Sequence, residues 1–292
     1  MLAAMRRAGI RVGTVVLRDR RAALGLRALD ARVVVVDTIA ANLAAPELGG
    51  LRARGSRVIA LAHMWHGALL LARRADGVIA VSGSLAEELV AAGVERRRVV
   101  VVRPGRDPLT RRASARRSGS VLCVANWIPT KGIHTLIAAV ARVPEVTLEL
   151  VGDAPDPVYA SRLRDLIGAR GVASRVRAYG SLSRAALERR YAAASIFALP
   201  SVREGYPIVV VEALAHGLPV IGCDIAGVRE VTDGAAILVP PGRIGPLAAA
   251  LRSLASDDRS REHLARRARR RARTLATWTE SGRDFVRAVR GR

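Results

Sequence analysis

The sequence predicts an α/β fold made of two Rossmann-like, doubly wound domains. Short apolar runs alternate with alanine-rich helical segments along almost all of the 292 residues, a pattern typical of parallel sheets covered by helices on both faces. Half of the residues are hydrophobic, which is enough for two modest cores. Residues 103–120 interrupt the alternation, because they are rich in Pro, Gly, Ser and Arg and have no apolar period.

The apolar runs form two series of predicted strands, one on each side of this interruption. The first series comprises residues 12–17, 33–37, 58–62, 78–82 and 99–102, and the second comprises residues 121–125, 147–151, 176–179, 196–199, 220–223 and 236–239. The predicted organisation is an N-terminal domain over 1–105, a linker over 106–118, a C-terminal domain over 119–275 and a final helix over 276–292. We expect the active site in a cleft between the domains, beyond the carboxyl ends of the strands.

The net charge of +23 would be compatible with a nucleic-acid partner. Aromatic residues make up only 3% of the chain, however, and no known nucleic-acid motif is present, so we expect no nucleic acid to bind. Arg far outnumbers Lys, which is typical of a GC-rich coding background and needs no partner. The basic surplus also favours phosphorylated substrates and peripheral contact with an anionic membrane.

Composition also bears on cellular location. Arg interrupts every apolar run before it reaches the length of a membrane span, and the start MLAAMRRAGIRV lacks the apolar segment of a signal peptide. Cys123 and Cys223 lie in apolar runs and are expected to be buried free thiols in a reducing compartment. We therefore expect a cytoplasmic protein, with peripheral contact at the inner face of the membrane as a further option.

The most informative stretch is PSVREGYPIVVVEALAHGLPVIG, residues 200–222. The predicted strand 196–199 leads into a turn and then a helix, and Pro207 suits the first helical position because its missing N–H is no loss there. Free amides at such a helix start favour an anion. These amides are expected to belong to Ile208, Val209 and Val210.

Two carboxylates flank this turn. Glu204 precedes it, and Glu212 lies just over one helical turn beyond its end, near enough to hydrogen-bond a sugar diol beside the anion. Gly205 lets a ligand approach the backbone, and Tyr206 completes the Gly-Tyr-Pro turn. An anion site between two carboxylates suits a molecule that is part phosphate and part sugar. The alternative is an ordinary strand-turn-helix with two solvated carboxylates.

The stretch resembles the two-glutamate signature of retaining GT-B glycosyltransferases, especially family 4. The resemblance implies that Glu204 faces the transferred sugar and that Glu212 holds the ribose of the nucleotide. It extends through the segments ADGVIAVSGSLAEELVAAGV, SVLCVANWIPTKGIHTLIAAV, LELVGD and YGSLSRAALERRYAAASIFALPS. ATWTESGRDFVRAV is similar to the terminal helix, which in the family crosses back to the first domain. The resemblance therefore implies the GT-B fold.

The start of the chain departs from this family pattern. LAAMRRAGIRVGTVVL is similar to the end of the first helix followed by the second strand. The first strand of the N-terminal domain, its glycine-rich loop and most of the first helix have no counterpart. A truncated chain, a misplaced start codon and a reduced variant are the three alternatives. The missing strand would leave an exposed position in the sheet.

Lys131 and Gly132 follow the strand 121–125 and begin a helix, where a lysine could meet a diphosphate. In the resembling family an Arg five residues before this Lys also contacts the donor diphosphate, but here that position is Asn126. Stabilisation of the leaving group would then depend more on Lys131 and on backbone amides. A solvated lysine at a helix start is the alternative.

Other candidate residues lie at predicted strand ends. Gly152 and Asp153 end the strand 147–151, where Gly permits close approach of a ligand and Asp153 is alternatively a helix cap. Gly180 falls in the segment where the family packs the nucleobase. His63 ends the strand 58–62 and resembles the family's cleft histidine near the reacting sugar and the acceptor, with a purely structural histidine as the alternative.

The sequence predicts no metal site and no cofactor. The two histidines of HMWH lack a third or fourth ligand, and there is no DxD triplet, G-x-G-x-x-G or P-loop. We expect metal-independent transfer of a sugar from a UDP-, GDP- or ADP-linked donor to a sugar, lipid or small-molecule acceptor, and the resemblance implies that the transfer proceeds with retention. Glu204, Lys131 and His63 are the catalytic candidates. The alternatives are a nucleotide-sugar-binding pseudoenzyme without a complete acceptor site and a related epimerase.

Overall fold

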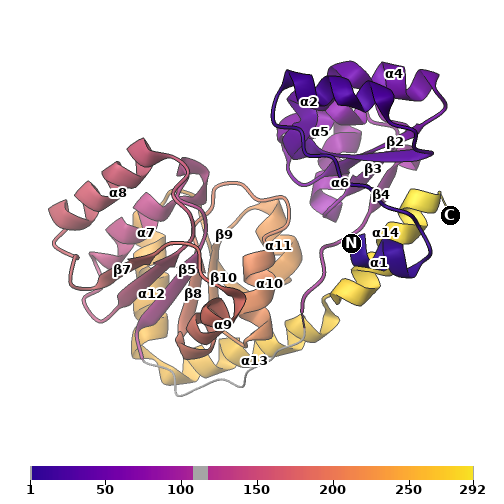
Figure 1. The fold of residues 1–292 in the computed structure, drawn as a ribbon. Helices are drawn as coiled ribbons and strands as arrows, with labels where there is room; N and C mark the ends of the chain where they lie inside the picture. Colours follow the sequence, from indigo (N-terminus) through magenta and orange to yellow (C-terminus); the bar gives the residue numbers. More distant parts are fainter. Residues whose placement is uncertain (1, 108–117, 292) are drawn as a thin grey trace. The chain divides into compact units, whose positions relative to one another are not determined.

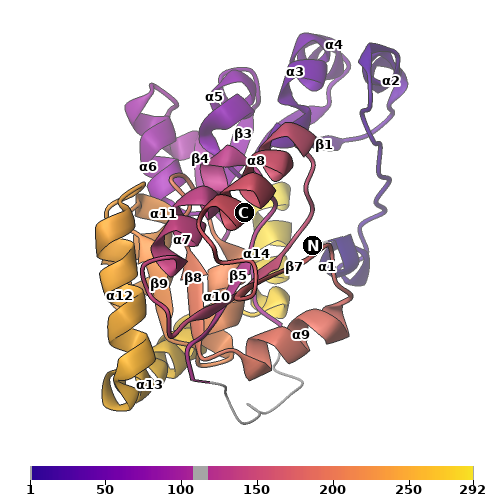
Figure 2. The same ribbon diagram turned by 90° about the vertical axis from the view of Figure 1, so that its left-hand side faces the viewer.

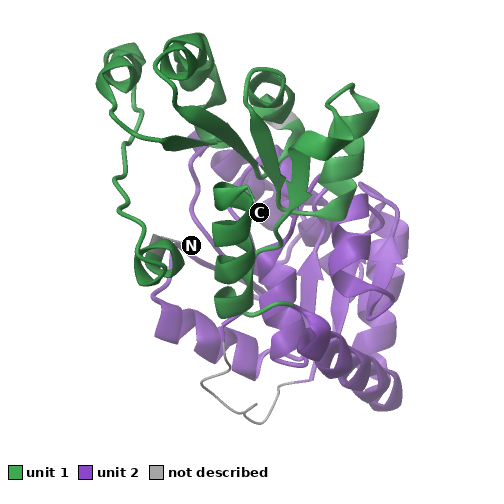
Figure 3. Ribbon diagram, turned by 90° about the vertical axis from the view of Figure 1, so that its right-hand side faces the viewer, with its two compact units in different colours: residues 1–105, 276–292 green, residues 106–275 purple. Residues whose placement is uncertain are grey.

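A computed structural model describes residues 2–107 and 118–291, so residues 108–117 of the predicted linker lie outside the described part. The chain forms two compact units (Figure 3). Unit 1 comprises Met1–Gly105 and Ala276–Arg292, and unit 2 comprises Arg106–Leu275. Each unit is built on one parallel sheet, which confirms the predicted α/β class.

Unit 1 has a four-stranded sheet in the order β1-β2-β3-β4. Its strands are β1 (Val33–Asp37), β2 (Arg57–Ala62), β3 (Gly77–Ala80) and β4 (Val99–Val101). Its α-helices are α1 (Leu2–Arg7), α2 (Arg20–Leu24), α3 (Ala41–Ala44), α4 (Leu48–Ala53), α5 (Trp65–Ala72), α6 (Gly83–Ala91) and α14 (Trp278–Arg290). Short 3₁₀ turns are η1 (Gly25–Ala28), η2 (Thr38–Ala40), η3 (Ala45–Glu47) and η4 (Arg96–Arg98).

The two ends of the chain pack together on one face of this sheet (Figure 1). Met5 of α1 and Phe285 of α14 share a core with Ile59 and Ile79 of the sheet. A capping box begins α14: the Thr277 hydroxyl accepts from the Glu280 amide, and the Glu280 carboxylate accepts from the Thr277 amide. The last helix is therefore part of the core of unit 1.

The predicted strand 12–17 is wrong. Residues 10–18 form no ladder with any described strand. Val12 packs at the margin of the unit 1 core, whereas the side chains of Val15 and Val16 are 51% and 65% exposed. A run of β-branched residues forms a strand only where a neighbouring strand accepts it, and no described strand pairs with this segment.

Unit 2 has a six-stranded sheet in the order β10-β9-β8-β5-β6-β7, and every paired strand is parallel. Its strands are β5 (Ser120–Val124), β6 (Thr147–Val151), β7 (Val176–Tyr179), β8 (Ile196–Leu199), β9 (Val220–Cys223) and β10 (Ala236–Val239). Its helices are η5 (Pro129–Lys131), α7 (Ile133–Val140), α8 (Pro157–Ala169), α9 (Arg184–Ala193), α10 (Ile208–Ala215), α11 (Ala226–Thr232), α12 (Ile244–Ser256) and α13 (Asp258–Thr274).

Helices cover both faces of this sheet (Figures 1 and 2). On one face, α7, α8 and α12 share a core with alternate strand residues such as Val121, Leu148 and Ile196. The opposite face is covered by α9, α10 and α11. Because both faces are buried, the central strands are apolar, as in Ile196–Leu199, where all four residues are buried, whereas β7 at the edge of the sheet is partly exposed.

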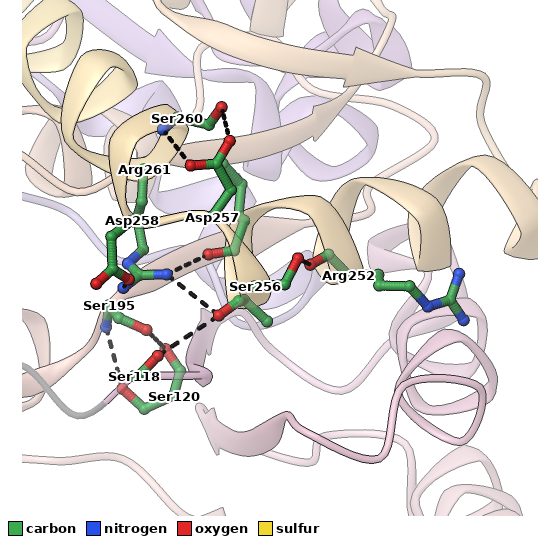
Figure 4. Close-up of polar contacts among 11 residues, drawn as sticks. Ser118, Ser120, Ser195, Arg252, Ser256, Asp257, Asp258, Ser260 and Arg261 are labelled. Atoms are coloured by element: carbon green, nitrogen blue, oxygen red, sulfur yellow. Dashed lines mark hydrogen bonds and ion pairs between the residues drawn. The ribbon is translucent and has the colours of Figure 1, made fainter.

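Polar contacts hold the amino ends of β5 and β8 together (Figure 4). The Ser195 amide and hydroxyl both donate to Ser120, each at 3.0 Å. Ser118 contacts the carbonyl of Ala255 at 3.5 Å, and Arg261 donates to the Leu254 carbonyl at 2.6 Å. These contacts attach the junction between α12 and α13 to the amino edge of the sheet.

No helix in the described part of the chain is long and apolar enough to cross a membrane. The predicted free thiols are confirmed, since Cys123 and Cys223 are both buried and unpaired by any disulfide. Burial raises the pKa of Cys123 to about 12 and that of Cys223 to about 11, so both remain neutral thiols near neutral pH.

Candidate active site

The order in which the chain adds strands to the unit 2 sheet reverses between β5 and β8. These strands are neighbours, yet the chain runs from β5 outward through β6 and β7, and from β8 outward through β9 and β10. The connections that follow the two strands therefore diverge at their carboxyl ends. Ligands of open α/β sheets bind at such a switch point. Lys131 lies in the connection after β5, and Glu204 lies in the connection after β8.

Lys131 and Glu204 form an ion pair. Nζ of Lys131 lies 2.6 Å from Oε1 of Glu204, and the two side chains are only 21% and 7% exposed. The sequence assigned them separate roles, on a phosphate and on a sugar, and the structure places them in direct contact. A carboxylate and an ammonium group held side by side could bind a ligand that carries both hydroxyls and negative charge.

Close backbone contact brings the two connections together. The Val202 amide donates to the Thr130 carbonyl at 2.9 Å. Gly132 has a φ of 65°, and a Cβ on it would lie 2.2 Å from the Pro200 carbonyl oxygen. Glycine is therefore required here for both its left-handed conformation and its lack of a side chain. This contact fixes the position of the adjacent Lys131.

The turn after Glu204 leads into α10, with one departure from the prediction. Pro207 is the N-cap residue, one position before the first helical residue Ile208. The Val210 amide was predicted to be free, but it donates to the Pro207 carbonyl at 2.9 Å. The amides of Ile208 and Val209 precede this first bond of the helix. One of the three amides predicted for the anion site, that of Val210, is thus already bonded within the helix.

The turn after Glu204 packs closely against α11. Tyr206 is buried, and a Cβ on Gly227 in α11 would lie 2.4 Å from the carbonyl oxygen of Glu204 and 3.0 Å from that of Gly205. Two buried polar atoms in the neighbouring connections, Ser201 Oγ and Trp127 Nε1, have no hydrogen-bond partner within the described residues. Buried polar atoms of this kind are normally satisfied by protein, water or ligand.

Asn126, Gly152 and Asp153 lie together at the ends of the adjacent strands β5 and β6. The Trp127 amide donates to the Asp153 carbonyl at 2.7 Å. Gly152 has a φ of 145°, and a Cβ on it would lie 2.2 Å from the Ala125 carbonyl oxygen. The backbone of Gly152 is thus required for the contact between these strand ends, in addition to any ligand that it admits.

Glu212 lies against α9. The Tyr191 hydroxyl donates to its Oε2 at 2.9 Å, and the Tyr191 ring stacks on His216 with centroids 5.1 Å apart. Burial raises the pKa of Glu212, while the hydrogen bond from Tyr191 and the charge of Arg184 act in the opposite direction. Among the described contacts, none joins Glu212 to Lys131 or Glu204.

A small cavity of about 40 Å³ adjoins Glu212. Arg184 on its wall pairs with Asp107 at 2.6 Å and with Glu188 at 3.1 Å. Tyr191, Arg184 and Asp107 are not among the site residues predicted from the sequence. Tyr191 and Arg184 belong to α9, and Asp107 precedes the predicted strand 121–125, so no local pattern connects these three residues with Glu212.

Gly180 follows β7 at the far end of the sheet. A Cβ on Gly180 would have no atom within 4 Å, so packing does not require glycine there. The preceding Tyr179 ring lies 4.2 Å from the guanidinium carbon of Arg190, and the Tyr179 carbonyl accepts from the Gly152 amide at 3.3 Å. The strand end is therefore connected to Gly152.

His63 belongs to unit 1 and lies at the carboxyl end of its sheet. Its Nε2 is 3.0 Å from Oδ2 of Asp37, and its amide donates to the Thr38 hydroxyl at 3.2 Å. Burial acts to raise the pKa of Asp37, but hydrogen bonds from His63 and from the Ile39 amide outweigh it, so the pKa is lowered. Asp37 could have been found from sequence, since it ends the strand next to the one that leads to His63.

In the described part of the chain, no group of three His, Cys, Asp or Glu side chains could hold a metal ion. The contacts around Lys131 and Glu204 are charge pairs and backbone hydrogen bonds.

The sequence matches the family of glycosyl transferases group 1 over residues 111–271, more than half of the chain. It is 28% identical to a glycogen synthase of Mycobacterium tuberculosis over 274 residues, which covers 89% of this chain and 64% of that relative. It is 32% identical to a D-inositol 3-phosphate glycosyltransferase of Jonesia denitrificans over 179 residues, which covers 58% of this chain and 42% of that relative. The chain thus spans less than two thirds of either relative.

The structure is similar to that of Anabaena HepE in complex with UDP and glucose, with a TM-score of 0.83, 21% identity, and coverage of 100% of this chain and 89% of HepE. At that identity the likeness shows the fold. The signature around Glu204 and Glu212 lies within the matched residues 111–271. The chain belongs to the glycosyl transferases group 1 family and has the GT-B fold.

Proposed function

We propose that the protein transfers a sugar from a nucleotide-diphosphate sugar to an acceptor hydroxyl, with retention and without a metal ion. The observation that carries this proposal is the Lys131–Glu204 pair at the switch point of the unit 2 sheet, with the start of α10 beside Glu204. Membership of the glycosyl transferases group 1 family supports it. A phosphate would bind the cationic side and the sugar hydroxyls the anionic side.

Each residue has a role in this proposal. Lys131 and the amides of Ile208 and Val209 stabilise the negative charge that develops on the leaving diphosphate. Glu204 accepts hydrogen bonds from the transferred sugar, and Glu212 accepts them from the ribose diol. For Glu212 this requires the carboxylate to exchange or share its bond with Tyr191.

The remaining candidates complete the proposed site. Gly205, Tyr206 and Pro207 shape the turn that contacts the sugar phosphate. Asn126, Gly152 and Asp153 line the strand ends beside it, and Gly180 lies near the base. His63 of unit 1 contacts the reacting sugar and the acceptor in this proposal, as in the resembling family.

UDP is the donor nucleotide that we place first, because the structurally similar HepE binds UDP, UDP-glucose and glucose. GDP and ADP sugars are the alternatives. A sugar, a lipid or a small molecule serves as acceptor. The two buried free thiols favour a cytoplasmic location, and the net charge of +23 favours peripheral contact with the anionic inner face of the membrane.

A second candidate function is nucleotide-sugar binding without transfer. Asn126 favours it, because it supplies no positive charge beside Lys131, and the leaving group then has one cation fewer. The two functions share the donor site and differ in turnover.

Thermal unfolding with UDP, GDP, ADP and their glucose conjugates tests the donor site. We expect one nucleotide to raise the melting temperature of the wild type, and Glu212→Ala and Lys131→Met to abolish the shift. Glu262→Ala is the matched control, because this carboxylate is 70% exposed on α13 and outside the site. If no nucleotide stabilises the wild type, the proposal is wrong.

Turnover is tested separately with the nucleotide sugar that binds. Release of the nucleoside diphosphate in the presence of a panel of sugar, inositol and lipid acceptors supports transfer, and the anomeric configuration of the product reports retention. If the nucleotide sugar binds but no nucleoside diphosphate is released with any acceptor, the second candidate function is supported.

A further inference from the structure

Unit 1 contains a pocket of about 660 Å³ that the proposed function does not use. We call it the arginine pocket, and its cationic residues are Arg52, Arg57, Arg73, Arg97 and Arg98. Arg57 begins β2, and Arg98 immediately precedes β4. Because the strands are parallel, the pocket lies at the amino edge of the sheet, opposite the edge that carries Asp37 and His63.

Charge in the arginine pocket is unbalanced. Asp76 and Glu95 are its only acidic lining residues within the described chain, against five guanidinium groups. Asp76 is 2.8 Å from Arg52 Nε, and Glu95 is 2.7 Å from Arg97 Nε. The remaining arginines leave a surplus of positive charge around one opening. Such a surplus attracts anions and is weakened by salt.

Two of these arginines are held in place by neutral groups. Arg57 donates to the Val289 carbonyl at 3.0 Å, and Arg98 donates to the carbonyls of Ala72, at 2.5 Å, and Ala75. Backbone carbonyls orient a guanidinium group without neutralising it. Arg57 and Arg98 are both partly buried, so little freedom is lost when an anion binds.

Arg73 differs from the others. It is exposed at the end of α5, and no hydrogen bond or ion pair involves its side chain among the described residues. A second pocket, of about 590 Å³ and lined by Leu69, Leu70, Arg73 and Arg74, shares Arg73 with the arginine pocket. Arg73 is therefore available to an anion that enters either pocket.

We propose that the arginine pocket binds a phosphate-bearing anion. A guanidinium group matches the oxygens of a phosphate with two parallel hydrogen bonds, and several converging guanidinium groups favour a ligand with more than one negative charge. The phosphate is either that of a free phosphorylated molecule or that of a lipid headgroup, and the adjoining Leu69 and Leu70 would contact the apolar part of a lipid. The proposal does not depend on the function of unit 2.

The test uses the whole protein at low ionic strength with two probes. Inorganic diphosphate is titrated calorimetrically, and vesicles of phosphatidylglycerol or of phosphatidylcholine are sedimented with the protein. The pocket variant is Arg73→Gln with Arg97→Gln, since both side chains are exposed and neither is required by the core. The matched control is Arg20→Gln with Arg21→Gln on α2, which removes the same charge from exposed positions elsewhere in unit 1.

We expect the pocket variant to bind one probe at least about tenfold more weakly than the wild type, and the control to bind nearly as well as the wild type. If the pocket variant loses diphosphate binding, the ligand is a free phosphate. If the pocket variant loses only its binding to phosphatidylglycerol vesicles, the ligand is a lipid headgroup. Titrations in a Lys131→Met background exclude diphosphate bound at the proposed donor site. Equal weakening in both variants, or binding of neither probe by the wild type, overturns the proposal.

Discussion

Nζ of Lys131 and Oε1 of Glu204 are 2.6 Å apart, although 73 positions separate the two residues in the sequence. The Glu204 side chain is 7% exposed, and among the described residues Lys131 is the cation paired with its carboxylate. Removal of either side chain would leave the other as an unpaired charge in a poorly hydrated environment.

We expect Lys131→Met and Glu204→Gln each to lower the free energy of unfolding by about 1–3 kcal/mol. The double variant should lose less than the sum of the two, because one interaction is removed twice in that sum. Urea unfolding of the four proteins measures the coupling. Additive losses would show that the pair contributes no interaction energy.

Gly132→Ala should be more harmful than its backbone conformation alone explains. Gly132 and Gly171 have nearly the same φ, 65° and 64°, but only at Gly132 would a Cβ meet another residue, the Pro200 carbonyl oxygen at 2.2 Å. We expect Gly171→Ala to cost about 1 kcal/mol of folding free energy, and Gly132→Ala about 1–3 kcal/mol more. Equal melting temperatures for the two variants would contradict the close contact.

Two buried serines should respond differently to substitution. Ser195 Oγ donates to the Ser120 carbonyl at 3.0 Å, whereas Ser201 Oγ has no partner among the described residues. We expect Ser195→Ala to lower the free energy of unfolding by about 1 kcal/mol, and Ser201→Ala to change it by less than about 0.5 kcal/mol or to raise it. A large loss in Ser201→Ala would reveal a bound water or ligand at this hydroxyl.

Stability should depend on pH through Glu212. Burial raises its pKa above the ordinary value of 4.5, so the folded protein holds this proton more tightly than the unfolded chain. Relative to Glu212→Gln, the wild type should lose free energy of unfolding as pH rises from about 4.5 through the pKa of the folded state, and the difference should then level off.

Tyr191→Phe is the companion variant for this pH dependence. It removes the hydrogen bond that opposes the effect of burial, and should raise the pKa of Glu212 further. The loss of stability should then extend to higher pH. Urea unfolding across the range tests both variants, and a wild-type curve parallel to that of Glu212→Gln at every pH would contradict the raised pKa.

Much of the fold could be predicted from the sequence because a buried parallel strand is apolar on both faces. Residues 33–37 and 196–199 were predicted with the bounds that the structure has. The prediction was wrong for residues 12–17, where the apolar run has no neighbouring strand. β-propensity describes a surface that fits a sheet and does not show whether a sheet is present.

The residues of the candidate site could be predicted from the sequence better than the contacts among them. Strand ends and a helix start mark Lys131 and Glu204 locally, but their ion pair depends on the approach of Gly132 to Pro200 across two connections. Likewise, Glu212 was recognised from its spacing, while its partner Tyr191 is supplied by the packing of another helix. Contacts between distant segments leave no local pattern.

The way the chain composes unit 1 has a consequence for synthesis. Phe285 and Val289 of α14 share a core with Ile59 and Ile79, so this core is completed only by residues that are translated after unit 2. Unit 2 is contained within Arg106–Leu275 and can fold before α14 has been made. We therefore expect the strands β1 to β4, although translated before unit 2, to complete their core after it, and to expose apolar surface in the meantime.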